Sequence, residues 1–158
     1  MPKRLPTAAR RAALALVLLA GPAMGHAQLL ADVLTATAIA ATFDSTVRFP
    51  SGSLRAMGDG VDALVRRLPG SDQWTEWEAY VARGLAANLK PAFVRDVMTS
   101  FAVAGYFEDT RESRTVDGPS GPETQTKITF ADMMGSHRYV LYVVEAGDTV
   151  AWLIGRAR

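Results

Sequence analysis

The stretch HRYVLYVVEAGDTVAWLIGR, residues 137–156, decides the fold. Two runs of β-branched, aromatic and aliphatic residues flank Ala146-Gly147, a pattern typical of two antiparallel strands joined by a tight turn. With a two-residue loop, one face of this hairpin carries Tyr139, Leu141, Val143, Val150, Trp152 and Ile154. The opposite face carries Val140, Tyr142, Val144, Ala151 and Leu153. Because both faces are apolar, each of them needs a cover.

Two further strands are predicted before this hairpin. Residues 106–116 are rich in Thr, Arg and Glu and indicate a polar strand at an edge of the sheet. In residues 123–131 the side chains alternate, with Thr124, Thr126, Ile128 and Phe130 on one side and Gln125, Lys127 and Thr129 on the other. The Gly- and Pro-rich stretch 117–122 predicts a turn between them.

The pattern before residue 106 is helical rather than alternating. Apolar residues recur at intervals of three and four, which predicts four helices, at residues 29–42, 53–68, 72–89 and 91–104. Trp74 and Trp77 fall on the packing stripe of the third helix and are predicted to be core. Gly58 and Gly60 weaken the first half of the second helix.

Helices followed by a strand meander imply an α+β fold, in which N-terminal helices pack on a C-terminal antiparallel β-meander of three to four strands. We expect residues 28–158 to form a single domain, with 28–105 mainly helical and 106–158 forming the antiparallel sheet. These 131 residues are enough for one hydrophobic core and too few for two.

Residues 1–27 have the pattern of a secretory signal peptide. Basic residues at positions 3, 4, 10 and 11 precede an apolar run at 12–20, and Gly25-His26-Ala27 offers small residues for cleavage before Gln28. The run is shorter than the roughly 20 residues that span a bilayer. We therefore expect cleavage at this point and a periplasmic or secreted protein with no membrane span in the mature chain.

Charge and cysteine content exclude several classes of protein. Four of the 17 Lys and Arg residues lie in 1–27 and none of the 16 Asp and Glu residues do, so removing this segment leaves 13 against 16. A slightly acidic chain argues against nucleic acid as a partner. The chain has no cysteine, and His137 is the single histidine after residue 27. We therefore expect no disulfide, no metal site and no cofactor.

Sequence motifs for catalysis are absent: the chain has no G-x-S-x-G, no phosphate loop and no G-x-G-x-x-G. The polar candidates that remain are Glu108, Glu112, Arg114 and His137. On a regular strand Glu108 and Glu112 share one face with Arg114 beyond them, but their Cα atoms lie roughly 13 Å apart, too far for a glycosidase pair unless a bulge intervenes. His137 needs an orienting carboxylate to act as a general base.

The sequence favours an exported, non-enzymatic binding or interaction domain that contacts a protein partner, an envelope component or an apolar small ligand. The candidate contact residues are on the second hairpin face: Val140, Tyr142, Val144 and Leu153. This face is either covered by the helix predicted at 29–42 or used for association, with a protein partner or in a homo-oligomer. A small extracytoplasmic hydrolase that uses Glu108, Glu112 or His137 is the alternative.

Overall fold

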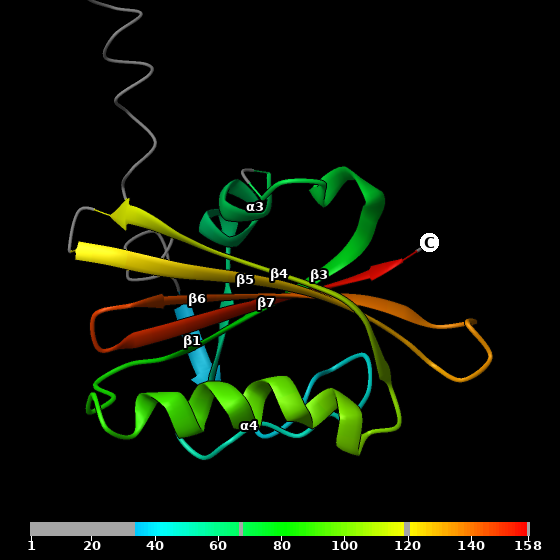
Figure 1. Cartoon of the computed structure of the whole chain (residues 1–158), viewed down its shortest axis with the longest axis horizontal. Coiled ribbons are helices and arrows are strands. Elements are labelled where there is room, and N and C mark those ends of the chain that lie inside the picture. Colours follow the sequence, from blue (N-terminus) through cyan, green and yellow to red (C-terminus); the bar gives the residue numbers. More distant parts are fainter. Residues whose placement is uncertain (1–33, 67, 119–120, 158) are drawn as a thin grey trace, which may run out of the picture.

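In the part of the chain that the structure describes, seven antiparallel strands form one sheet, in the order β1-β2-β3-β7-β6-β5-β4 (Figure 1). The computed structural model describes residues 34–66, 68–118 and 121–157. The predicted signal peptide and its cleavage site lie outside the described residues. The strands are β1 (Leu34–Thr37), β2 (Leu54–Met57), β3 (Trp74–Ala82), β4 (Phe107–Gly118), β5 (Gly121–Ala131), β6 (Arg138–Ala146) and β7 (Thr149–Ala157).

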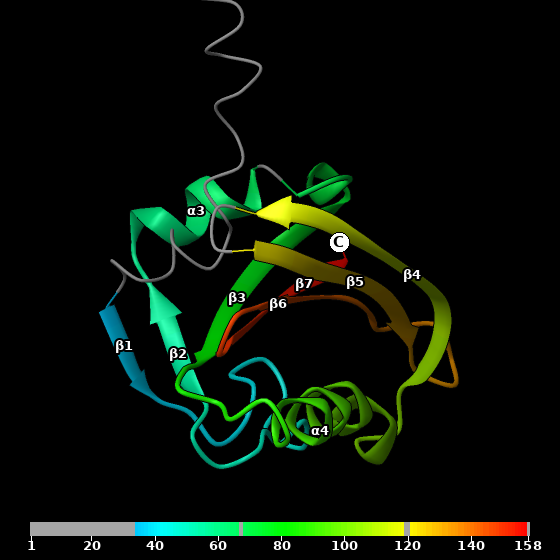
Figure 2. The ribbon, with the colours of Figure 1, turned by 60° about the vertical axis from the view of Figure 1, so that its left-hand side comes forward.

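Two α-helices of the described residues lie on opposite sides of this sheet, α3 (Asp59–Val65) on one side and α4 (Lys90–Val103) on the other (Figure 1). A short 3-10 turn, Ser71–Gln73, precedes β3. The sheet curves around α4, as Figure 2 shows. The face toward α4 is therefore called the concave face, and the face toward α3 the convex face. Neither helix combines the length and the apolar character that a membrane crossing requires.

Trp152 of β7 lies at the centre of the concave core and is fully buried. Its ring centroid is 5.7 Å from that of Tyr80 on β3, 5.7 Å from that of Phe93 on α4, and 5.4 Å from that of Phe49 between β1 and β2. Each buried aromatic side chain removes about 150–250 Å² from water, so this cluster is a large part of the hydrophobic stabilisation. Trp152 thus ties three separate segments to β7.

On the convex face, Val61 and Leu64 of α3 and the following Leu68 form the cover. They belong to one buried cluster with Ala56, Ala79, Val140, Tyr142, Val144, Ala151 and Leu153. The other six hairpin residues lie in the concave core, and Ala146 pairs with Thr149 across a two-residue loop. The predicted division of the hairpin into two faces is therefore confirmed. Among the described residues, α3 covers the convex face. Ala38 and Ala41, which belong to the helix predicted at 29–42, pack in the concave core instead.

The predicted α+β fold, with helices packed on a three- to four-stranded meander, is wrong. The segment 72–89 supplies strand β3 instead of a helix. Its pairing register with β7 shifts between Trp74 and Glu76, which puts Trp74 and Trp77 on the same convex face at a spacing of three residues. The β-bulge therefore places two apolar residues three positions apart on one face, and this spacing is also typical of a helix.

The predictions of continuous helices at 29–42 and at 53–68 are also wrong. Residues 34–37 of the segment 29–42 are strand β1. The segment 53–68 divides at Gly58, whose φ of 111° lies in a region that favours glycine, so Leu54–Met57 is strand β2 and α3 begins at Asp59. The helix predicted at 91–104 is confirmed by α4.

The four predicted strands after residue 105 are confirmed by β4 to β7. The predicted alternation along 123–131 also holds: Thr126, Ile128 and Phe130 pair with concave-face residues of β6. Gln125 and Lys127 pair with Val144 and Tyr142, on the convex face. The segments predicted as helix that form strands instead thus all lie before residue 90.

Gly155 of β7 provides a test of the convex core. A Cβ at this position would lie 2.9 Å from Trp77 Cη2, 2.9 Å from Val140 Cγ1 and 3.0 Å from Trp74 Cβ. These contacts are too close, and we expect Gly155→Ala to lower the free energy of unfolding by about 1–3 kcal/mol through overpacking. Urea denaturation measures this value.

The control is a double-mutant cycle with Val140→Ala, which removes one of the two closest atoms. The cost of Gly155→Ala should be smaller in that background. A Gly155→Ala variant as stable as the parent would contradict the packing described for this face.

Candidate functional site

A pocket of about 210 Å³ opens on the convex face, between the chain at Leu68-Pro69 and strands β4 to β6. Two neighbouring cross-strand rows supply its side chains. The first row is Glu112, Lys127 and Tyr142, and the second is Arg114, Gln125 and Val144. Side chains two residues apart on a strand share a face, so the rows lie side by side. The pocket is thus built from three strands and one covering loop.

The pocket exists because the cover of the convex face ends at Pro69. Leu64 and Leu68 pack over the β3–β7–β6 side of the sheet, and Tyr142 reaches back from β6 to this cover. Its hydroxyl donates a hydrogen bond to the carbonyl oxygen of Pro69 at 2.5 Å. Beyond that contact the convex sides of β5 and β4 border the pocket. Tyr142 therefore marks the boundary between core and pocket.

Two cations and one carboxylate line the polar part of the pocket. Lys127 Nζ lies 5.9 Å from the centroid of the Tyr142 ring, within reach of a cation–π interaction. Arg114 Nε donates to Gln125 Oε1 at 2.9 Å. Among the described residues, neither Lys127 nor Arg114 forms an ion pair with a carboxylate. With Glu112 included, the pocket carries one net positive charge.

The Tyr142 phenol stays protonated over the physiological range. Burial raises the pKa of Tyr142 to about 12, and the negative charge of Glu112 adds to this shift. The neutral hydroxyl keeps its proton for the bond to Pro69. The Tyr142 side of the pocket is therefore uncharged at physiological pH.

The four candidate contact residues of the sequence analysis divide between core and pocket. Val140 and Leu153 are fully buried and lie in the cluster that α3 covers, so they offer no surface to a ligand. Tyr142 and Val144 are also largely buried, but both line the pocket. Contact of these two residues with a ligand stays a prediction.

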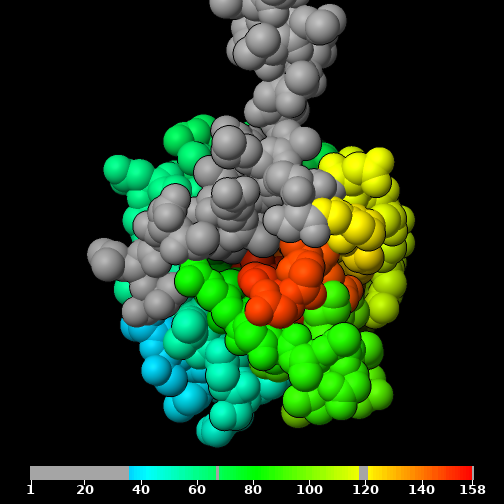
Figure 3. Space-filling model, turned by 90° about the vertical axis from the view of Figure 1, so that its left-hand side faces the viewer, coloured from blue at the N-terminus to red at the C-terminus, as the bar shows by residue number. Residues whose placement is uncertain are grey.

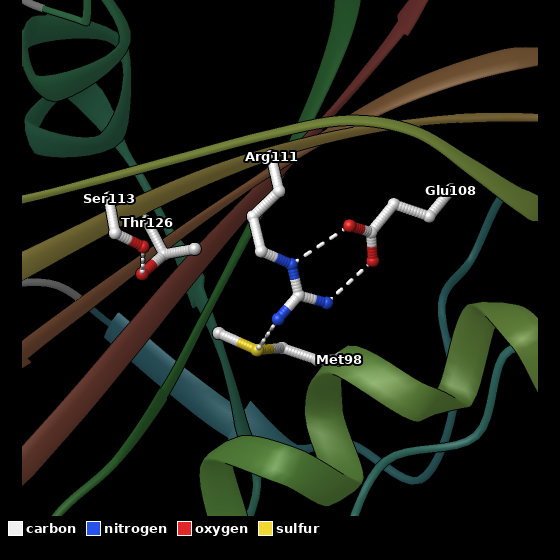
Figure 4. A network of polar contacts seen from close by, with 5 residues as sticks. All are labelled: Met98, Glu108, Arg111, Ser113 and Thr126. Carbon is white, nitrogen blue, oxygen red and sulfur yellow. Dashed lines mark hydrogen bonds and ion pairs between the residues drawn. The ribbon is translucent and has the colours of Figure 1, made fainter.

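The polar candidates divide as well. Glu112 and Arg114 line the pocket, whereas Glu108 lies elsewhere, so the expected alignment of Glu108 with Glu112 is wrong. The register of β4 shifts between Glu108 and Thr110. This bulge places Glu108 on the concave face, which Arg111 shares. Arg111 donates to Glu108 at 2.9 and 2.5 Å and approaches Met98 of α4 at 3.9 Å (Figure 4).

In the structure, Asp132 supplies a carboxylate that orients His137, and the sequence alone did not identify this partner. Its Nδ1 lies 2.9 Å from Asp132 Oδ2 in the exposed turn between β5 and β6. The hydrogen bond from His137, with others from Ser136, holds the pKa of Asp132 well below its usual range. However, the Ser136 hydroxyl donates to Asp132 and is not bonded to His137 in the described structure, so this serine has no activating base. His137 also does not line the pocket.

Sequence reasoning missed Leu68, Pro69, Gln125 and Lys127 as pocket residues. The alternation along 123–131 placed Gln125 and Lys127 on one face. The chain at Leu68-Pro69 covers part of this face and so forms the pocket, but the helix predicted at 53–68 did not indicate that position. Among the described residues, no three His, Asp or Glu side chains lie close enough together to hold a metal ion.

Comparison of the chain with protein-family models, with curated proteins and with solved structures finds no match. The functional argument therefore depends on the geometry of the pocket alone.

The raised pKa of Tyr142 predicts how stability responds to alkaline pH. The unfolded chain loses this phenolic proton near pH 10, whereas the folded chain keeps it to about pH 12. The free energy of unfolding should therefore fall as pH rises from about 10 to 12. Burial raises the pKa of Tyr80 and of Tyr106 as well, so both contribute in the same direction.

Tyr142→Phe is the matched variant. It should cost about 1 kcal/mol at neutral pH, because the hydrogen bond to Pro69 is lost, and should make the alkaline decline shallower. Urea denaturation at pH 8, 10 and 11 measures both effects. An alkaline decline as steep as that of the parent would show that Tyr142 is not the group described.

Proposed function

We propose that this chain is a non-enzymatic binding domain, exported from the cytoplasm, that takes a small ligand in the convex pocket. The observation that carries the proposal is the composition of the pocket wall. Leu68, Pro69, Tyr142 and Val144 supply an apolar side, and Lys127 and Arg114 supply two cations without a carboxylate partner among the described residues. Such a wall suits a molecule with an apolar body and one anionic end.

Charge and size narrow the ligand class. Lys127 stands between Glu112 on β4 and Tyr142 on β6, so an anion that meets its ammonium group also places an apolar body against the Tyr142 ring. Glu112 disfavours a strongly negative ligand by repulsion, which favours a monoanion. At about 210 Å³ the pocket is smaller than the roughly 300–1,000 Å³ of drug-sized sites. We therefore expect a small apolar carboxylate.

The test uses benzoate and hexanoate as probes and benzyl alcohol as the uncharged control. Benzoate should shift the backbone amide signals of residues 112–114, 125–127 and 142–144 in NMR spectra. Lys127→Gln should weaken this binding by at least tenfold, because the cation that meets the carboxylate is removed. Benzyl alcohol should bind more weakly than benzoate.

Lys90→Gln is the matched control, since it removes the same charge from α4, where Lys90 Nζ donates to the Gly147 carbonyl away from the pocket. Its affinity for benzoate should equal that of the parent. Failure of both carboxylates to shift the pocket signals, or equal binding by Lys127→Gln, would contradict the proposal.

Hydrolysis is the second candidate function, and the Asp132–His137 hydrogen bond is the observation in its favour. The pair lies in an exposed turn that does not border the pocket, and Ser136 donates to the carboxylate, so binding is the better supported function. Turnover of an ester or glycoside substrate that His137→Ala or Glu112→Gln abolishes would favour hydrolysis instead.

A further inference from the structure

Strand β4 is a long edge of the sheet. Within the described residues it pairs with β5 alone, so one side of its 12 residues carries backbone N–H and C=O groups with no strand beside them. Figure 2 shows β4 at the outer margin of the sheet, and in Figure 3 the yellow atoms of β4 and β5 form the right-hand border of the molecule. An edge of this kind is a template for pairing with another strand.

The middle of this edge has the regular geometry that pairing needs. The bulge lies at the beginning of the strand, between Glu108 and Thr110, and the register from Thr110 to Gly118 is continuous. The segment 110–116 contains no proline, and its side chains are exposed or half-buried. Its charges therefore decide which strand can lie beside it.

A second copy of β4 is a strand whose charges fit. Two identical antiparallel strands are related by a two-fold axis that sets one residue opposite its own copy. With the axis at Ser113, Glu112 lies opposite Arg114 of the second copy, and the same pair forms again on the other side of the axis. Both pairs lie on the convex face, because Glu112 and Arg114 share it.

The neighbouring registers are disfavoured by repulsion. An axis at Arg111, Glu112 or Arg114 would set that charged residue against its own copy, and like charges directly opposite are destabilising. The Ser113 register avoids this and leaves Thr110 opposite Val116 and Arg111 opposite Thr115. Charge thus selects one register from its neighbours.

Both members of the charge pair have free capacity. Arg114 uses its Nε for Gln125, which leaves its two terminal nitrogens for a carboxylate. Glu112 forms no ion pair with another described residue. We propose that the chain associates as a symmetric dimer, in which β4 pairs antiparallel with β4 of a second copy about Ser113 and joins the two sheets.

The first test is the mass in solution of the protein produced from its full-length sequence, measured by light scattering after size-exclusion chromatography. The parent should have the mass of two chains. Glu112→Arg and Arg114→Glu each set like charges against each other twice, so each should weaken association by at least tenfold. The double variant Glu112→Arg/Arg114→Glu restores both pairs with reversed signs and should be a dimer again.

The second test reads the register directly, because the chain has no cysteine of its own. Paired antiparallel residues have Cα atoms about 4.5–5.5 Å apart, within the range of a disulfide. Under oxidation, Ser113→Cys should therefore form a covalent dimer at least ten times faster than Arg111→Cys or Thr115→Cys, each of which faces a different residue.

A parent that stays monomeric at about 100 μM would overturn the proposal. Single charge variants that dimerise as well as the parent, or equal cross-linking at the three cysteine positions, would also overturn it. Far-UV circular dichroism of every variant checks that the sheet is intact. If a charge variant unfolds, the cross-linking rates of the three cysteine variants decide the result.

Discussion

The β6–β7 hairpin has two apolar faces, and the rest of the structure follows from the need to cover both. On one face Trp152 gathers aromatic side chains from β3, from α4 and from the segment between β1 and β2. On the other face Leu153 and Val140 are buried with α3. An antiparallel sheet with one wet face would alternate apolar and polar residues along these strands. The hairpin strands do not alternate, so both faces of the sheet must be covered. The result is three layers, with α4 on one side of the sheet and α3 on the other.

The unequal size of the two covers creates the pocket. α4 has 14 residues and follows the curved concave face, whereas α3 has seven. The short helix and the chain to Pro69 cover the centre of the convex face, and the outer convex side of β4 and β5 is left with Glu112, Arg114 and Lys127. The same geometry that completes the core therefore leaves polar residues together at one edge of the sheet. The ligand proposal and the dimer proposal share Glu112 and Arg114, and Lys127 belongs to the ligand proposal alone.

Sequence pattern predicted the second half of the fold and only part of the first. α4 and β5 were predictable because their side chains follow an uninterrupted period of about 3.6 residues and of two residues. The hairpin and β4 were predictable because runs of strand-forming residues are separated by turn residues. Strand β3 was not, because a bulge places Trp74 and Trp77 on one face three residues apart. A second bulge in β4 likewise separates Glu108 from Glu112. Bulges depend on the partner strand, which the local sequence does not specify. Half of the polar candidates, Glu112 and Arg114, nevertheless lie in the pocket.

The central claim is that the last hairpin is the doubly covered centre of the sheet. Hydrogen–deuterium exchange followed by mass spectrometry tests it most directly, because amides at the centre exchange only on global unfolding whereas those at an edge exchange by local opening. Peptides from residues 139–145 and 150–154 should be the slowest to exchange, and those from β1, at the other end of the strand order, much faster. Exchange of the hairpin as fast as that of residues 34–37 would contradict the account.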